Sequence, residues 1–244
     1  MNSDRFRFFS SVHQESDLLV GVSFDSYQDD MESVCREEQL RLYKLLSAHI
    51  AQFPSFASSL NPLPIQGGDR EFDLELKTMY KLASVTGTGP MSSVAGLFAQ
   101  GVGRVLGGHD KDFSAEVMVE NGGDLYVRNQ EDLVVVVQAG DVSLSGKLGL
   151  VIPPGEWGIC TSSGTLGHSY SKGKADALTI VCHDTPLADA WATALANSIE
   201  GKEDIRPLLK KVEGLSEILA CVVIVDGELG ILGNFETKLL SSGA

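Results

Sequence analysis

The chain has 244 residues, 43% of them hydrophobic, which suffices for the core of one domain or of two small ones sharing a sheet. Its 33 acidic and 19 basic residues give a net charge of −14, which argues against a nucleic-acid partner. The sequence has neither a membrane-length apolar run nor a signal-peptide pattern, so we expect a cytoplasmic protein with no membrane partner. The four cysteines form no CxxC pair, which favours reduced, buried thiols over zinc ligands.

The first half of the chain predicts a hairpin followed by helices. Strand patterns cover about 5–12 and 17–25, and helical spacing covers about 29–52 and 72–85. A Gly-rich loop then leads to Pro90, which suits the first turn of another helix. Small residues line one face of that helix, which predicts a close packing partner: Ala95, Ala99 and Gly103.

The second half predicts mostly strands. Residues 114–129 read as two strands around the Gly122-Gly123 turn, and further strands cover 132–140, 147–153 and 177–184. Thr185 and Pro186 cap and start an alanine-rich helix, and 221–232 form a closing hairpin. The pattern predicts an α+β fold with mostly antiparallel sheets.

Asp189 and Thr193 stand four residues apart in the alanine-rich stretch 188–197. On a helix this spacing places a carboxylate and a hydroxyl on one face, one turn apart. Their hard oxygens suit Mg²⁺ or Ca²⁺, although two ligands alone do not complete a site. The alternative is an acid that the dipole at the helix N-terminus stabilises.

Two glycine-containing stretches are candidates for ligand contact. The turn Gly122-Gly123-Asp124 is either a plain hairpin turn or a place where a ligand approaches the backbone, with Asp124 supporting a hydroxyl or a metal. The loop that contains Gly89 and Met91 precedes a helix N-terminus, whose free amides suit a phosphate. The alternative for that loop is tight packing alone.

The polar stretch 161–176 is a third candidate. Hydroxyls and backbone amides in this stretch could donate hydrogen bonds to phosphate oxygens. The candidate donors are Ser162, Ser163, Gly164 and Thr165. His168 in the same stretch is either a solvated side chain or a proton-transfer group. The serine does not match a nucleophile elbow, so a serine hydrolase is disfavoured.

In this order the motifs resemble the ApbE superfamily, the FAD:protein FMN transferases, and most closely its small ApbE-like branch. The segments that carry the resemblance span most of the chain: GPMSSVAGLFAQ, VENGGDLYV, GICTSSGTLGHSYSKGKADALTIV and LADAWATALAN. The resemblance implies a duplicated α+β architecture of the T-fold kind. Residues 1–244 would then form one domain, with two similar halves around a central cleft.

The resemblance also implies roles for individual residues. In the transferases, Mg²⁺ and FAD bind in the cleft, and FMN passes to a threonine of an acceptor protein. Asp189 and Thr193, in the D-A-x-x-T segment, would supply metal oxygens. The G-G-D turn at 122–124 would contact the flavin nucleotide, and His168 would act in catalysis.

Two segments depart from the transferase pattern. Residues 169–173 read SYSKG where the transferases have D-P-x-T-G, and MSSVAG stands where they have an A-K-G lysine. Three functions therefore stay open. The chain transfers FMN in a Mg²⁺-dependent reaction, binds a flavin or another nucleotide without turnover, or serves as a structural subunit. Homo-oligomerisation is open as well.

Overall fold

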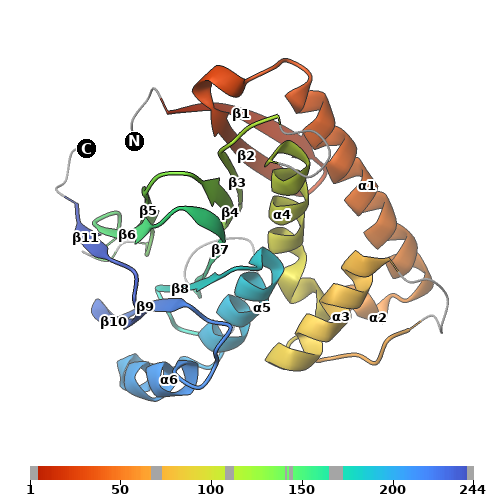
Figure 1. Cartoon of the computed structure of the whole chain (residues 1–244). Helices are drawn as coiled ribbons and strands as arrows, with labels where there is room; N and C mark the ends of the chain where they lie inside the picture. The colour runs from red at the N-terminus through yellow and green to blue at the C-terminus, as the bar shows by residue number, and fades with distance from the viewer. Residues whose placement is uncertain are drawn as a thin grey trace.

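A computed structural model describes residues 5–66, 73–107, 113–140, 142, 145–164 and 173–240 (Figure 1). The strands are β1 (Phe6–His13), β2 (Ser16–Ser23), β3 (Val117–Asn121), β4 (Asp124–Asn129), β5 (Leu133–Val137), β6 (Leu148–Ile152), β7 (Gly155–Ser162), β8 (Ala177–Cys182), β9 (Ala220–Val225), β10 (Glu228–Gly233) and β11 (Thr237–Leu239). The α-helices are α1 (Met31–Gln52), α2 (Ser55–Ser58), α3 (Leu74–Thr86), α4 (Val94–Gly107), α5 (Thr185–Ala196) and α6 (Ile205–Val212). Short 3₁₀ turns are η1 (Phe24–Ser26), η2 (Pro90–Ser93) and η3 (Lys202–Asp204).

The strands form two antiparallel sheets. The larger has eight strands in the order β1-β2-β3-β4-β7-β8-β9-β10, and the smaller has three in the order β11-β6-β5. The predicted α+β class with mostly antiparallel sheets is confirmed, since every pairing between the described strands is antiparallel. In the larger sheet, helices separate β1–β2 from β3–β4, and again β7–β8 from β9–β10. That the two halves are similar stays a prediction.

The eight-stranded sheet lies between two layers. Helices α4 and α5 pack on one of its faces, with α1 beside α4 and α3 beside α5 (Figure 1). The three-stranded sheet covers part of the opposite face, where Val127, Ile159 and Val222 meet Leu148 and Ile152 of β6 in one buried cluster. Both faces of the central strands are therefore shielded from water, as their runs of buried residues require.

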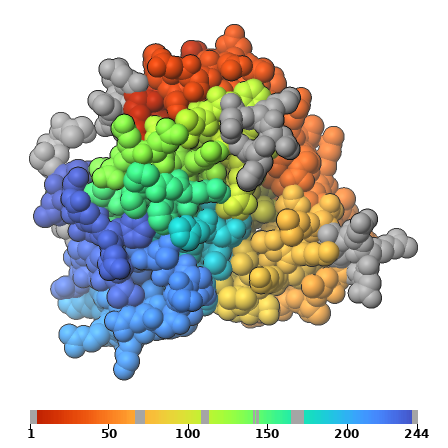
Figure 2. Space-filling model, viewed as in Figure 1, coloured from red at the N-terminus to blue at the C-terminus, as the bar shows by residue number. Residues whose placement is uncertain are grey.

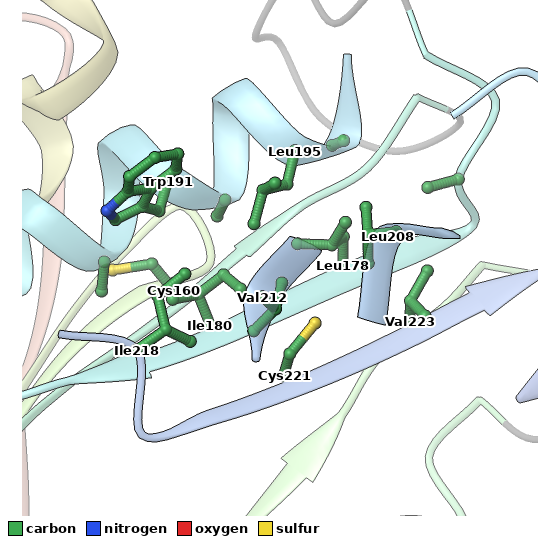
Figure 3. Close-up of a cluster of buried hydrophobic side chains, with 14 of the residues drawn as sticks. Cys160, Leu178, Ile180, Trp191, Leu195, Leu208, Val212, Ile218, Cys221 and Val223 are labelled. Carbon is green, nitrogen blue, oxygen red and sulfur yellow. The ribbon is translucent and has the colours of Figure 1, made fainter. Parts of the chain in front are cut away.

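A second cluster joins α5 and α6 to the same strands (Figure 3). Trp191 and Leu195 of α5 pack with Ile180 of β8, while Leu208 of α6 packs with Val223 of β9. The alanines of α5 leave little bulk between helix and sheet, so the helix axis can lie close to the strands. Close packing of α5 is what brings its polar side chains near the strand ends.

Two predicted helix starts need correction. The N-cap of α5 is Asp184, whose side chain accepts a hydrogen bond from the Leu187 amide at 3.0 Å, so the predicted cap Thr185 is wrong. The backbone of Asp184 is extended, as an N-cap requires, whereas Thr185 is already helical. Pro90 begins a 3₁₀ turn, and α-helical geometry starts only at Val94.

The short elements α2 and β11 were not predicted from the sequence, nor were the longer β7 and α6. Strand β7 pairs with both β4 and β8, so the first residues of the predicted polar loop, Thr161 and Ser162, are part of a central strand. Helix α6 carries Pro207 near its start, where a missing N–H costs no intrahelical hydrogen bond.

The four cysteines are free and buried, as their apolar surroundings predicted. Burial raises the pKa of the thiols at Cys35 and Cys221 to about 12, so they stay protonated at neutral pH. Among the helices of the described residues, none is both long and apolar enough to cross a membrane.

The predicted close packing along α4 is confirmed at Gly103. A Cβ atom there would lie 2.1 Å from a ring atom of Tyr126, which is 1% exposed and held in the sheet. Gly103→Ala should therefore lower the free energy of unfolding by about 1–3 kcal/mol, measured by urea denaturation. Gly101→Ala is the matched control, because its Cβ would meet only the flexible ends of Leu42 and Glu38 at 3.0 and 3.1 Å. Equal stability of the two variants would contradict this packing.

Candidate functional site

Asp189 lies in the second turn of α5 and points at the first turn of α4. Its side chain is 8% exposed, and its Oδ2 atom accepts a hydrogen bond from the Gly96 amide at 2.9 Å. The Ala95 amide also hydrogen-bonds this carboxylate. A Cβ at Gly96 would lie 2.6 Å from the Thr185 carbonyl oxygen, so only glycine lets the two helices approach this closely. Asp189 therefore caps α4 from the neighbouring helix.

Asp124 begins β4, directly after the glycine turn. Gly122 and Gly123 have φ values of +64° and +106°, so the hairpin itself requires both glycines, whatever else the turn does. The Gly123 amide donates to Oε1 of Glu120 at 2.8 Å, and its carbonyl accepts from the Thr161 amide at 3.1 Å. The end of β7 thus lies beside the G-G-D turn.

The carboxyl groups of Asp124 and Asp189 lie close enough to repel each other. Burial, and then the charge of Asp124, hold the pKa of Asp189 well above its usual range, while the Gly96 and Ala95 amides act in the opposite direction. Burial also raises the pKa of Asp124 to about 7, against a lowering effect of a hydrogen bond from Cys160. Among the salt bridges of the described residues, none involves either carboxylate.

Cys160 connects the two acidic positions and was missed by the sequence analysis. It pairs with Asp124 across the β4–β7 ladder, so its thiol and the Asp124 carboxylate affect each other's pKa, while the thiol donates to the Thr185 carbonyl. The same sulfur lies 3.5 Å from the carbonyl oxygen of Thr185 at the start of α5. Burial and the nearby acids keep its pKa well above the usual range, so the thiol stays protonated and can donate.

The described part of the polar stretch follows β7. Ser162 is the last residue of that strand, and the Gly164 amide donates to the Ala175 carbonyl at 2.9 Å. A Cβ at Gly164 would lie 1.8 Å from the Gly173 carbonyl oxygen, so this segment and residues 173–175 run in close backbone contact. Thr165 and His168 lie outside the described residues.

The remaining candidates are not joined to the carboxylates of Asp124 or Asp189 by any hydrogen bond of the described residues. Thr193 is half-buried one turn after Asp189, and the described contacts do not join its hydroxyl to either acid. Gly89 is buried against the chain itself, because a Cβ there would lie 1.7 Å from the Ser59 carbonyl oxygen. Met91 packs among apolar side chains from α1 and α3. Of the amides at the start of α4, at least those of Ala95 and Gly96 already serve Asp189.

The acidic pair fits a hard divalent cation. Within the described residues no group of three or more His, Cys, Asp or Glu side chains is arranged to hold a metal. Mg²⁺, however, is commonly held by one or two carboxylates together with water and substrate phosphates. The buried carboxylate of Asp189 and the half-buried carboxylate of Asp124 have no cationic partner among the described salt bridges, so such an ion would stabilise them, and Thr193 could add a third oxygen.

Stability should depend on pH through Asp124. Its pKa is raised from 3.8 to about 7, so the folded protein binds more protons than the unfolded chain between these values. The stabilising contribution of the neutral acid is fully present below about pH 4 and is lost as the pH rises through 7. In EDTA, Asp124→Asn should therefore have a higher Tm than the unmodified protein at pH 8, by several degrees, and an equal Tm near pH 4.

Glu37→Gln is the matched control for this measurement, because it removes an exposed carboxylate from helix α1, away from the G-G-D turn. Its Tm should differ little from that of the unmodified protein across this pH range. A pH-independent Tm difference for Asp124→Asn would show that the substitution acts through packing and not through ionisation.

Sequence comparison places the chain among known relatives. A family model described as "AbpE bacteria" matches residues 1–226. A UPF0280 protein of Methanopyrus kandleri is 37% identical over 230 residues, which cover 91% of this chain and 88% of that protein. A UPF0280 protein of Methanocaldococcus jannaschii is 29% identical, with the same coverage of 91% and 88%.

Comparison with solved structures supports the same fold. The ApbE protein of Thermotoga maritima has a TM-score of 0.57 at 12% identity, covering 96% of this chain and 97% of that one. A variant of the flavin transferase ApbE of Vibrio cholerae also has a TM-score of 0.57 at 12% identity, covering 93% and 96%. The chain belongs to the family described as "AbpE bacteria", within the ApbE-like superfamily, and has its α+β fold.

Proposed function

We propose that this protein binds a flavin nucleotide through a divalent cation held by Asp124 and Asp189, and transfers FMN from FAD to a threonine of an acceptor protein. The observation that carries the proposal is that the half-buried Asp124 of the G-G-D turn lies near enough to the buried Asp189 for its charge to act on it, and neither has a cationic partner among the described salt bridges. The flavin transferase with the same fold supports the choice of ligand and reaction.

Each residue of the site has a proposed task. Asp124 and Asp189 would hold Mg²⁺, with Thr193 as a further oxygen ligand, and the ion would supply positive charge to offset the negative charge of phosphate oxygens. Backbone amides of α4 hydrogen-bond the Asp189 carboxylate and fix its orientation, so this metal ligand is in position before the ion binds. His168 accepts the proton of the acceptor hydroxyl, whose oxygen bonds to the phosphorus of the FMN moiety as the pyrophosphate bond of FAD breaks and AMP leaves.

Two further groups are proposed to contact the nucleotide. The G-G-D turn lies at one end of the β4–β7 pair, and the segment 162–165 begins at the same end. Backbone amides and hydroxyls there can meet the phosphates. Gly89 and Met91 shape the neighbouring wall, since η2 packs beside α5. These amides and hydroxyls would recognise a phosphate group, which FAD, FMN and other nucleotides all carry.

Thermal unfolding with FAD, FMN or ATP, each with Mg²⁺ or with EDTA, tests the binding step. A ligand at 100 times its Kd stabilises the protein by about 2.7 kcal/mol, which corresponds to a Tm rise of about 5–10 °C for a chain of this size. We expect this rise for FAD only in the presence of Mg²⁺. An equal rise in EDTA would contradict the metal-dependent site.

A binding module without turnover is the second candidate. It is favoured by the SYSKG segment at 169–173 and by Ser92 and Ser93, which stand where the transferases have an A-K-G lysine. Incubation with FAD, Mg²⁺ and threonine-containing acceptors, followed by mass spectrometry, separates the two functions. Flavin binding without any FMN adduct would favour the module, and absence of both would favour a structural subunit.

A further inference from the structure

Helix α6 and the preceding turn η3 present a row of basic side chains to solvent. Lys202, Arg206 and Lys210 are exposed and follow one another at intervals of four residues, in a chain with 33 acidic and only 19 basic residues. Arg206 and Lys210 take part in none of the salt bridges of the described residues. We call Lys202, Arg206 and Lys210 the basic row.

The basic row is held on the outside of the molecule. Leu208 and Val212 anchor α6 in the cluster shared with α5, which turns the basic side chains outward. Figures 1 and 2 show α6 at one end of the molecule, on the opposite side of α5 from α3. Within the described part of the chain, the row's one ion pair joins Lys202 to Glu228 at 3.9 Å between exposed groups, which contributes little stability.

A groove of about 420 Å³ lies at the N-terminal end of this row. Its lining residues come from the start of α6 with η3 and from the start of β10: Lys202, Glu203, Ile205, Arg206, Glu228 and Leu229. Leu229 is 38% exposed, and β10 is an edge strand of the eight-stranded sheet. The groove therefore combines apolar contact surface with two cations of the basic row and with the carboxylates of Glu203 and Glu228, one of which pairs with Lys202.

The spacing of the row matches an extended peptide. Residues four apart on a helix are separated by about 6 Å along its axis, and residues two apart on a strand by about 6.6–6.8 Å. Acidic side chains at every second residue of a strand can thus meet successive cations, while the intervening side chains point to the other side. We propose that the basic row binds an extended acidic segment of a partner protein, whose carboxylates meet Arg206 and Lys210 and whose apolar side chain lies in the groove against Leu229.

This partner chemistry follows from the charge distribution. Elsewhere the chain is strongly acidic, so a long polyanion such as nucleic acid would be repelled beyond the row, whereas a short acidic segment would not. The attraction is between exposed charges and is therefore screened by salt. Binding of the segment should weaken markedly between about 0.05 and 0.5 M NaCl.

The proposal is tested by fluorescence anisotropy of a labelled peptide. The peptide has Glu at every second residue and Leu or Ser between the glutamates. We expect saturable binding that Arg206→Glu/Lys210→Glu weakens by about tenfold or more. Lys77→Glu/Lys81→Glu is the matched control, because these lysines are exposed at the same four-residue spacing on α3. That variant should bind the peptide as the unmodified protein does.

Three results would overturn the proposal. One is that the Arg206→Glu/Lys210→Glu variant binds the peptide as tightly as the unmodified protein does, or that the unmodified protein shows no saturable binding. Circular dichroism must show that both proteins are folded. Another is equal affinity for a peptide of the same composition with its glutamates in one block. The third is tighter binding of a single-stranded oligonucleotide, or loss of a dimer in sedimentation velocity on charge reversal, since either would assign the row to another occupant.

Discussion

Replacing Asp189 with asparagine should weaken Mg²⁺-dependent FAD binding by about 100-fold or more while leaving the fold intact. The asparagine side chain would keep an oxygen that can accept from the Gly96 amide at the 2.9 Å seen for the carboxylate, so the cap of α4 is retained. What the substitution removes is the negative charge at a buried position next to Asp124. The loss therefore reports on the cation and not on helix packing.

Isothermal titration of FAD with Mg²⁺ measures this loss, and two further variants give it meaning. Asp184→Asn removes a charge from the same helix, and asparagine is an equally good N-cap, so FAD affinity should change little. Asp189→Ala removes both the charge and the cap, and should also lower the free energy of unfolding by about 1–2 kcal/mol. Unchanged affinity of Asp189→Asn would show that Asp189 serves packing alone.

The dual role of Asp189 follows from where the two helices meet. A carboxylate has two oxygens with about four acceptor positions, so hydrogen bonds from Ala95 and Gly96 leave room for a metal ion. The same bonds stop the side chain from turning away when no ion is bound. Glycine at position 96 is needed for this contact, because any Cβ there would collide with Thr185. The packing requirement and the proposed ligand role thus share one set of residues.

Much of the fold could be predicted because its signals are local. The turn at Gly122-Gly123 and the closing turn at Asp226-Gly227 both have the positive φ values that their residue types indicate. The small side chain at Gly103 correctly indicated a close neighbour on α4. By contrast, β7 begins after two prolines and contains Gly155 and Gly158, so its local pattern is weak and its place is set by β4 and β8.

The candidate site was less accessible to sequence reasoning. Nothing local indicates that Asp124 and Asp189, 65 positions apart, lie near each other. The resemblance implied that they share a cleft, and the packing of α5 on the sheet brings Asp189 within reach of the Asp124 charge. Cys160 looked like one more buried thiol, and only its pairing with Asp124 reveals the contact. The sequence predicted free amides at the helix N-terminus that follows Gly89 and Met91, but at the start of α4 the amides of Ala95 and Gly96 are occupied by Asp189, because α4 and α5 touch.

His168→Ala should abolish FMN transfer while leaving FAD and Mg²⁺ binding intact. His168 lies outside the described residues, so its role as general base rests on the resemblance and on its place in a polar, Gly-rich stretch. A general base must come within about 2.6–3.2 Å of the group it deprotonates, directly or through one water, and its loss typically costs 10²–10⁴-fold in rate. We therefore expect the rate of FMN addition to an acceptor threonine, followed by mass spectrometry, to fall by about that factor.

His183→Ala is the matched control for this rate, because that histidine is exposed, stacks on Trp157, and lies at the other end of β7 from the acidic pair. Its variant should transfer FMN at the unmodified rate. If His168→Ala instead gives an equal yield of adduct, the transfer is real and another residue accepts the proton. If the unmodified protein binds FAD but modifies no acceptor, no general base is in use, and flavin binding without turnover becomes the function that the carboxylate pair supports.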